Sequence, residues 1–128
     1  MRLAFALTLL LGWAVRAHAG EVIAHPTVSL SADEIRDVFL GEKQLAGDLK
    51  LVPVDNNAVQ GEFLSKVLQT DARKYSARWT KKTFREGVAA PALKGSDAEV
   101  AAFVRSTPGA VGYVSGTSTA GVKLLEKF

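Results

Sequence analysis

The sequence predicts an α/β domain in which helices pack against a small, largely parallel sheet. Short apolar or β-branched segments alternate with amphipathic segments, which is the order of strands and helices in α/β folds. Two amphipathic segments open on a serine, Ser31 and Ser96, followed three residues later by a glutamate, a pair that is typical of helix starts. Glycine or proline ends most segments, and the chain shows no internal repeat that would indicate another architecture.

The first 19 residues are expected to be a secretory signal peptide. Arg2, an apolar run from Leu3 to Val15 and the ending Ala17-His18-Ala19 are typical of such a leader. A membrane anchor is the alternative, but the run is shorter than the about 20 residues that span a bilayer. We therefore expect a periplasmic protein with a single domain over residues 20–128.

Composition excludes several classes of function for residues 20–128. These 109 residues are enough for one small domain. Of the 16 basic residues, 14 remain once Arg2 and Arg16 are removed, against 13 acidic ones, so the net charge is +1 and we expect no nucleic-acid partner. The chain has no cysteine, and His25 is the one histidine in this range, so we expect no disulfide, no metal site and no cofactor.

The first half of the domain is expected to hold two strands and two helices. EVIAHPTV, residues 21–28, is β-branched and short, as strands are. A helix begins at Ser31 and ends at Gly41, LVPV (51–54) forms a second strand, and a second helix begins near Ala58. The apolar positions at helical spacing are Ile35, Val38 and Phe39 in the first helix, and Phe63, Leu64, Val67 and Leu68 in the second.

The second half begins with a helix over 70–84, capped by Asp71 and facing the core through Tyr75 and Trp79. Residues 85–95 are expected to be a loop, because two glycines and a proline interrupt them. The elements expected after that are a helix from Ser96, a strand at 110–114, a polar loop at 115–121 and, at 122–128, either a strand or a short helix.

The stretch LVPVDNNAVQGEF, 51–63, is the first candidate site. It leads from a strand into a helix, and the first N–H groups of a helix often hold a phosphate. We select Asp55, Asn56, Asn57 and Gln60 as the candidate ligand-binding residues. In the alternative interpretation Asn57 and Gln60 only cap the helix, while Asp55 and Glu62 would repel a dianion.

The basic stretch RKYSARWTKKTFR, 73–85, is the second candidate site. At helical spacing five of its six cations fall in one sector beside Tyr75 and Trp79. This sector is either a solvated face or a docking surface for an acidic partner, anionic lipid headgroups or an anionic polymer. The candidate docking residues are Lys74, Arg78, Lys81, Lys82 and Arg85.

Catalysis is not expected. The sequence shows no nucleophile elbow, no cluster of metal ligands and no well-spaced pair of acids. The segment SGTSTAG, 115–121, offers hydroxyl and backbone donors that could hold an anion, but its composition is also that of ordinary turns. His25 precedes a proline and is expected at a strand end, not in an active site.

The order of LSADEIRDVFLGEK, LVPVDN and SDAEVAAFVRSTPGAVGYV resembles the phosphate ABC transporter substrate-binding protein family. The resemblance rests on Leu30 to Gly41 and on Thr107 to Val114 and extends from about Val22. It implies one three-layer lobe of the periplasmic-binding-protein-like type, with a small mixed, largely parallel sheet and about four helices. The family's phosphate cradle in this lobe is arginine, a small residue, aspartate, glycine, serine, glycine, threonine. Asp55 matches its aspartate, and the other positions differ.

The resemblance implies a solute-binding role, with a small anion or polar solute as ligand and an ABC permease or another envelope protein as partner. Because one lobe supplies half of the usual cleft, a homodimer could restore it. The alternative function is a periplasmic interaction module that docks a partner through the basic helix 73–85, with peripheral membrane contact as one form of docking.

Overall fold

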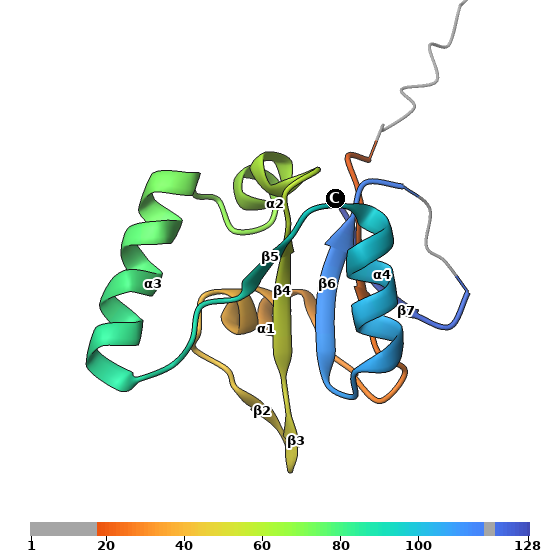
Figure 1. Ribbon diagram of the computed structural model, residues 1–128, viewed down its shortest axis with the longest axis horizontal. Coiled ribbons are helices and arrows are strands. Elements are labelled where there is room, and N and C mark those ends of the chain that lie inside the picture. The colour runs from red at the N-terminus through yellow and green to blue at the C-terminus, as the bar shows by residue number, and fades with distance from the viewer. Residues whose placement is uncertain (1–17, 117–119) are drawn as a thin grey trace, which may run out of the picture.

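A five-stranded sheet with the order β5-β4-β6-β1-β7 forms the centre of the protein (Figure 1). The computed structural model describes residues 18–116 and 120–128. The strands of the sheet are β1 (Glu21–Ala24), β4 (Val52–Asn56), β5 (Ala92–Lys94), β6 (Ala110–Val114) and β7 (Lys123–Lys127). Strands β2 (Leu45–Ala46) and β3 (Leu49–Lys50) form a separate two-stranded hairpin.

The sheet is mixed, as the sequence predicted. Strand β4 pairs in parallel with β5 and with β6, whereas β1 pairs antiparallel with β6 and with β7. Four strands therefore share one direction and β1 runs against them. The carboxyl ends of β4, β5 and β6 meet at one edge of the sheet, which is the upper edge in Figure 1.

Four helices in the described residues complete a three-layer lobe. They are α1 (Ala32–Phe39), α2 (Gln60–Lys66), α3 (Ala72–Glu86) and α4 (Asp97–Ser106). The first three contribute to a core on one face of the sheet, in which Phe39, Phe63 and Tyr113 are fully buried. Helix α4 packs on the other face, where Val100 and Val104 meet apolar side chains of the sheet. The predicted fold class is confirmed.

Strand β6 shows how the two cores share one sheet. Val111 and Tyr113 point toward α1–α3, and Ala110 and Val114 point toward α4, because successive side chains of a strand alternate between faces. The ring of Tyr113 stacks on that of Phe63 with a centroid distance of 3.8 Å. The strand is buried over its whole length.

Three helix starts follow the predicted caps. The Ser31 side chain accepts a hydrogen bond from the Glu34 N–H, and the Glu34 carboxylate accepts one from the Ser31 N–H. The Asp71 carboxylate accepts from the Lys74 N–H at 2.9 Å, so it caps α3. Ser96 caps α4 in the same way, but the second half of this capping box is absent, because the Glu99 carboxylate accepts from Gly95 N–H instead.

Several boundaries differ from the sequence predictions. The strand predicted at 21–28 ends at Ala24, because the chain turns there through a hydrogen bond from Val28 N–H to the His25 carbonyl. The predicted loop 85–95 contains strand β5, which pairs with β4 despite its flanking proline and glycine. The β2–β3 hairpin was not predicted, and the segment 122–128 forms strand β7. Residues 1–17 of the predicted leader, and 117–119 of the polar loop, lie outside the described residues.

Two glycines of the Thr107–Val114 segment allow it to pack closely against neighbouring elements. Gly109 has a φ of +83°, and a Cβ at this position would overlap the Lys50 carbonyl oxygen. A Cβ at Gly112 would lie 2.7 Å from Val100 Cγ1, because α4 packs directly on this strand. The first glycine therefore lets the chain turn close to β3, and the second lets α4 approach the sheet.

Candidate functional site

The candidate site lies at the carboxyl ends of β4 and β6, where open α/β sheets bind ligands. Strand β4 ends at Asn56 and continues through the exposed Asn57 into α2. Strand β6 ends at Val114 and is followed by the exposed Ser115. Asp97, the first residue of α4, lies between the two strand ends. We call Asn56, Asn57, Gln60, Asp97 and Ser115 the strand-end site.

The Asp97 carboxylate occupies the donors of this site. Asn56 Nδ2 donates to its Oδ1 at 2.7 Å, Ser115 N–H donates to the same oxygen at 3.0 Å, and Ser115 Oγ donates to its Oδ2 at 2.5 Å. These hydrogen bonds hold the pKa of Asp97 below its usual range even though burial acts to raise it. Asp97 is therefore ionised at neutral pH, and the protein's own carboxylate sits among donors that could bind an external anion.

Asn56 joins three segments through one amide. Besides the bond to Asp97, its Nδ2 donates to the Tyr113 carbonyl at 3.0 Å, and its Oδ1 accepts from the Ala58 N–H at 2.9 Å. The side chain is fully buried. This explains why the predicted cap is wrong: α2 begins at Gln60 with Val59 at the N-cap position and no side-chain cap, because Asn56, not Asn57, holds the turn.

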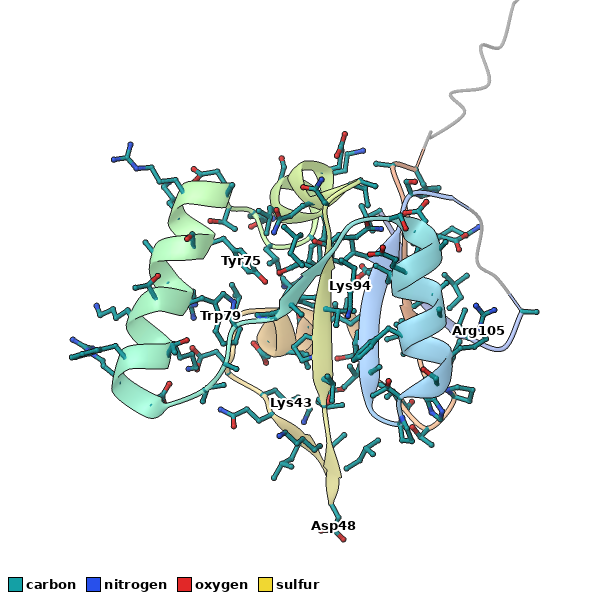
Figure 2. All side chains as sticks on the ribbon, in the orientation of Figure 1. Lys43, Asp48, Tyr75, Trp79, Lys94 and Arg105 are labelled. Carbon is teal, nitrogen blue, oxygen red and sulfur yellow. The ribbon has the colours of Figure 1, made fainter. Side chains whose placement is uncertain are left out.

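Asp55 faces the opposite side of β4, as strand alternation requires. It is 2% exposed, and it accepts hydrogen bonds from the Tyr75 hydroxyl at Oδ2 and from the Tyr113 hydroxyl at Oδ1, each at 2.8 Å. Burial raises its pKa to about 6, although both tyrosines act to lower it. Burial and the nearby carboxylate raise the pKa values of both phenols. Figure 2 shows Tyr75 and Trp79 pointing from α3 toward the sheet.

The four predicted ligand residues therefore do not form one cluster. The side chains of Asp55 and Asn56 are buried on opposite faces of the sheet, and only Asn57 and Gln60 reach the surface at this edge, exposed and half-buried respectively. The sequence analysis did not select Asp97 and Ser115. Asp97 is the first residue of a helix, and Ser115 directly follows a strand. Their polar side chains at these two positions were the signal in the sequence that could have identified them.

The predicted basic sector divides in the structure. Arg78 and Lys82 are tied to carboxylates: Arg78 pairs with Glu42 at 2.8 Å, and Lys82, whose side chain is 13% exposed, pairs with Glu86 at 2.9 Å and with Glu42 at 3.6 Å. These residues line a shallow groove of about 510 Å³ together with Lys81 and Arg85. Tyr75 and Trp79 are buried, as predicted, and Trp79 Nε1 donates to the Phe39 carbonyl at 3.0 Å.

A second hollow, of about 800 Å³, opens at the amino ends of β4 and β5. Its walls are mostly apolar and include Trp79, Pro91 and Phe103, with Lys43 and Lys50 among the few charged residues. The Lys43 ammonium group pairs with the Glu34 carboxylate at 3.4 Å, and Glu34 lies outside the lining of the hollow. The sequence analysis did not predict this hollow, because it depends on the β2–β3 hairpin.

Neither a metal centre nor a membrane span is found in the part of the chain that the structure describes. Within residues 18–116 and 120–128, no group of three or more histidine, cysteine, aspartate or glutamate side chains is placed to hold a metal ion. Over the same ranges, no helix has the length and apolar character that crossing a bilayer requires.

Comparison with known proteins identifies the fold. No protein-family model matches the sequence, and no curated protein matches it significantly. An ABC-type phosphate transport receptor from Vibrio cholerae is similar in structure, with a TM-score of 0.54 and 16% identity over 85% of this chain and 46% of its own. A Clostridium perfringens protein described as a phosphate ABC transporter substrate-binding protein, with bound phosphate, has a TM-score of 0.62 and 15% identity over 85% of this chain and 44% of its own.

These similarities show that the lobe has a periplasmic-binding-protein-like fold. The chain spans less than half the length of either structure, so it corresponds to one part of the larger proteins.

Proposed function

We propose that this protein is a periplasmic, non-catalytic solute-binding protein that binds a small anion weakly at the strand-end site. One observation carries the proposal: Asn57 and Gln60 reach the surface at the carboxyl ends of the parallel strands, in a fold shared with a structure that holds phosphate. This is the edge at which open α/β sheets bind ligands. The leader-like residues 1–19 support export.

Weak binding follows from the occupied donors. Asn56 and Ser115 already donate to Asp97, so an incoming anion meets the amides of Asn57 and Gln60 beside an ionised carboxylate. A single lobe also supplies about half the contacts of a two-lobed cleft. We therefore expect a Kd near 1 mM, or about 4 kcal/mol of binding free energy, not the roughly 8 kcal/mol of a micromolar site. A homodimer or an ABC permease would add the missing wall of the site.

The test is an NMR titration of the chain with sodium phosphate, following the backbone and side-chain amides of residues 56–61. We expect saturable shifts confined to this segment, with none in sodium chloride at the same ionic strength. The double variant Asn57→Asp with Gln60→Glu keeps the side-chain shapes but adds two negative charges, and should weaken binding at least tenfold. Gln44→Glu, an exposed change at the other end of the sheet, is the control and should bind as the parent does. Absence of shifts up to about 50 mM phosphate, or equal loss in the control, would overturn the proposal.

Docking through the basic helix is a second candidate function, and it concerns a different surface. The observation that favours it is the concentration of charge on α3: six basic residues and one acidic residue lie within Ala72–Glu86. The class of partner is argued below.

A further inference from the structure

Positive charge is concentrated in helix α3. Of the 14 basic and 13 acidic residues in 20–128, six basic and one acidic lie in this helix. The helix therefore has a net charge of +5, and the remainder of residues 20–128 has a net charge of −4. Such a separation of charge orients a protein toward an anionic surface and raises its rate of encounter with one.

The face of α3 turned away from the core also carries a bare aromatic side chain. Phe84 is 92% exposed, the highest value among the large apolar residues at the surface of the described structure. It follows the buried Tyr75 by nine residues, or two and a half helical turns, so the two side chains lie on opposite sides of α3. The cations exposed on the same outer side or its flank are Arg73, Lys74, Lys81 and Arg85.

The outer cations differ from the inner ones in their partners. Arg78 and Lys82 make the salt bridges of α3 found in the described part of the chain, with Glu42 and Glu86. Lys81 and Arg85 take part in none of these salt bridges. Their charges therefore add to the electrostatic field on the outer side of the helix. Helix α3 lies at one end of the lobe, at the left of Figure 1, and its outer side faces away from the sheet.

We propose that the outer face of α3 docks on an anionic lipid surface, with Phe84 inserting among the headgroups and Lys74, Lys81 and Arg85 contacting their phosphates. This inference deepens the second candidate function and does not depend on solute binding. It combines the two features of interfacial helices, cations on a polar face and an aromatic side chain that can leave water. Each cation close to such a surface is worth about a fivefold gain in binding.

A lipid surface fits better than an acidic protein because of the shape and chemistry of the face. The α3 side is a projecting ridge with one exposed ring, and the groove beside it is lined by Glu42 and Glu86 as well as by cations. An acidic side chain entering that groove would meet both carboxylates. A flat bilayer touches the ridge without entering the groove, and of the groove's lining residues only Lys81 and Arg85 need to reach it.

The test is co-sedimentation of residues 18–128 with lipid vesicles. This part of the chain contains every strand, helix and core of the described structure, and it omits the apolar run 3–15 so that this run does not contribute to vesicle binding. We expect binding to vesicles of equal parts phosphatidylglycerol and phosphatidylcholine at low salt, none to phosphatidylcholine alone, and release by salt. Lys81→Glu with Arg85→Glu should weaken binding at least tenfold. Lys66→Glu with Lys123→Glu makes the same change in charge elsewhere and should weaken it less than threefold.

Phe84→Trp reports on insertion. The emission of the introduced indole should shift to the blue and lose access to iodide when anionic vesicles are added, while the buried Trp79 contributes a constant background. No vesicle binding at low salt, equal loss in the two charge variants, or an introduced indole that stays open to iodide would each overturn the proposal. Binding to soluble polyglutamate but not to vesicles would also overturn it, while leaving docking to an acidic protein as the function of α3.

Discussion

The hydroxyl of Tyr113 on β6 donates a hydrogen bond of 2.8 Å to the carboxylate of Asp55 on the neighbouring strand β4. The Tyr75 hydroxyl reaches the other carboxylate oxygen from α3 at the same distance. One buried carboxylate therefore joins its own strand to α3 and to β6, through tyrosines that lie 20 and 58 residues away from it in sequence. Substitutions can test both this connection and the strand-end site.

Replacing Asp55 by asparagine should change how stability depends on pH. The folded pKa of Asp55 is about 6 and the unfolded value is about 3.9, so between these pH values the folded protein holds a proton that the unfolded chain has released. The contribution is fully present below about pH 4 and is lost as pH rises through 6. The free energy of unfolding of the parent, relative to Asp55→Asn, should fall by about 2 kcal/mol from pH 4 to pH 7.

Urea unfolding at intervals of one pH unit, followed by Trp79 fluorescence, measures this difference. Carboxylates with lowered pKa, such as Glu34 and Asp97, act in the opposite direction, but they are present in both proteins and cancel. A difference that stays level or grows between pH 4 and pH 7 would contradict the assigned environment of Asp55.

Removing the Tyr75 hydroxyl should loosen α3. The Tyr75→Phe variant keeps the ring but leaves an ionised carboxylate with one donor fewer, so we expect a loss of about 1–3 kcal/mol in unfolding free energy at pH 8. The loss should shrink at pH 4, where Asp55 is protonated. A double-mutant cycle with Asp55→Asn isolates the pair, and additive effects of the two changes would show that the hydrogen bond carries no coupling.

Adding a methyl group at Gly112 should separate α4 from the sheet. A Cβ there would lie 2.7 Å from Val100 Cγ1 and 3.1 Å from Val54 Cγ2, inside a packed core. Gly112→Ala should therefore cost about 1–3 kcal/mol in thermal or urea unfolding. The matched control is Gly61→Ala, an exposed helical glycine with no heavy atom within 4 Å of the added Cβ, which should stabilise the protein by about 0.5–1 kcal/mol. Similar costs at both positions would argue against the packing of α4 on β6.

Truncating Asp97 should open the strand-end site to an external anion. In Asp97→Ala the donors of Asn56 and Ser115 lose their acceptor, which should cost about 1–3 kcal/mol in unfolding free energy. Formate or phosphate should then raise the melting temperature of this variant more than that of the parent, because the ion can take the place of the carboxylate. Glu99→Ala, which removes a carboxylate from the same helix start, is the control. Equal anion effects on all three proteins would show that Asp97 does not fill an anion position.

Local signals in the sequence were sufficient for most of the elements. Ser31, Asp71 and Ser96 mark helix starts because a side-chain acceptor within three residues satisfies an N–H that has no partner in the helix. The burial of Tyr75 and Trp79 followed from their spacing. By contrast, β5 was missed because three residues between a proline and a glycine have no strand signal of their own, and only pairing with β4 makes them a strand.

The four residues selected from the sequence as candidate ligands do not share one surface. Asn57 and Gln60 reach the surface at the carboxyl edge of the sheet, but Asp55 is turned to the core, because successive residues of a strand face opposite sides. The single basic sector divided because Glu42, 36 residues before Arg78 in sequence, comes to lie beside it in space.

The sequence alone determined the class of fold, the starts of α1, α3 and α4, the apolar faces and the charge of α3, since each depends on residues within a few positions of one another. Only the tertiary structure decided that Asp97 meets Asn56 and Ser115, and that Asp55 meets Tyr75 and Tyr113. Those contacts join residues that lie between 18 and 58 positions apart. Hydrogen bonds of this kind form where packed strands and helices bring a donor and an acceptor together, and no local pattern specifies that distance.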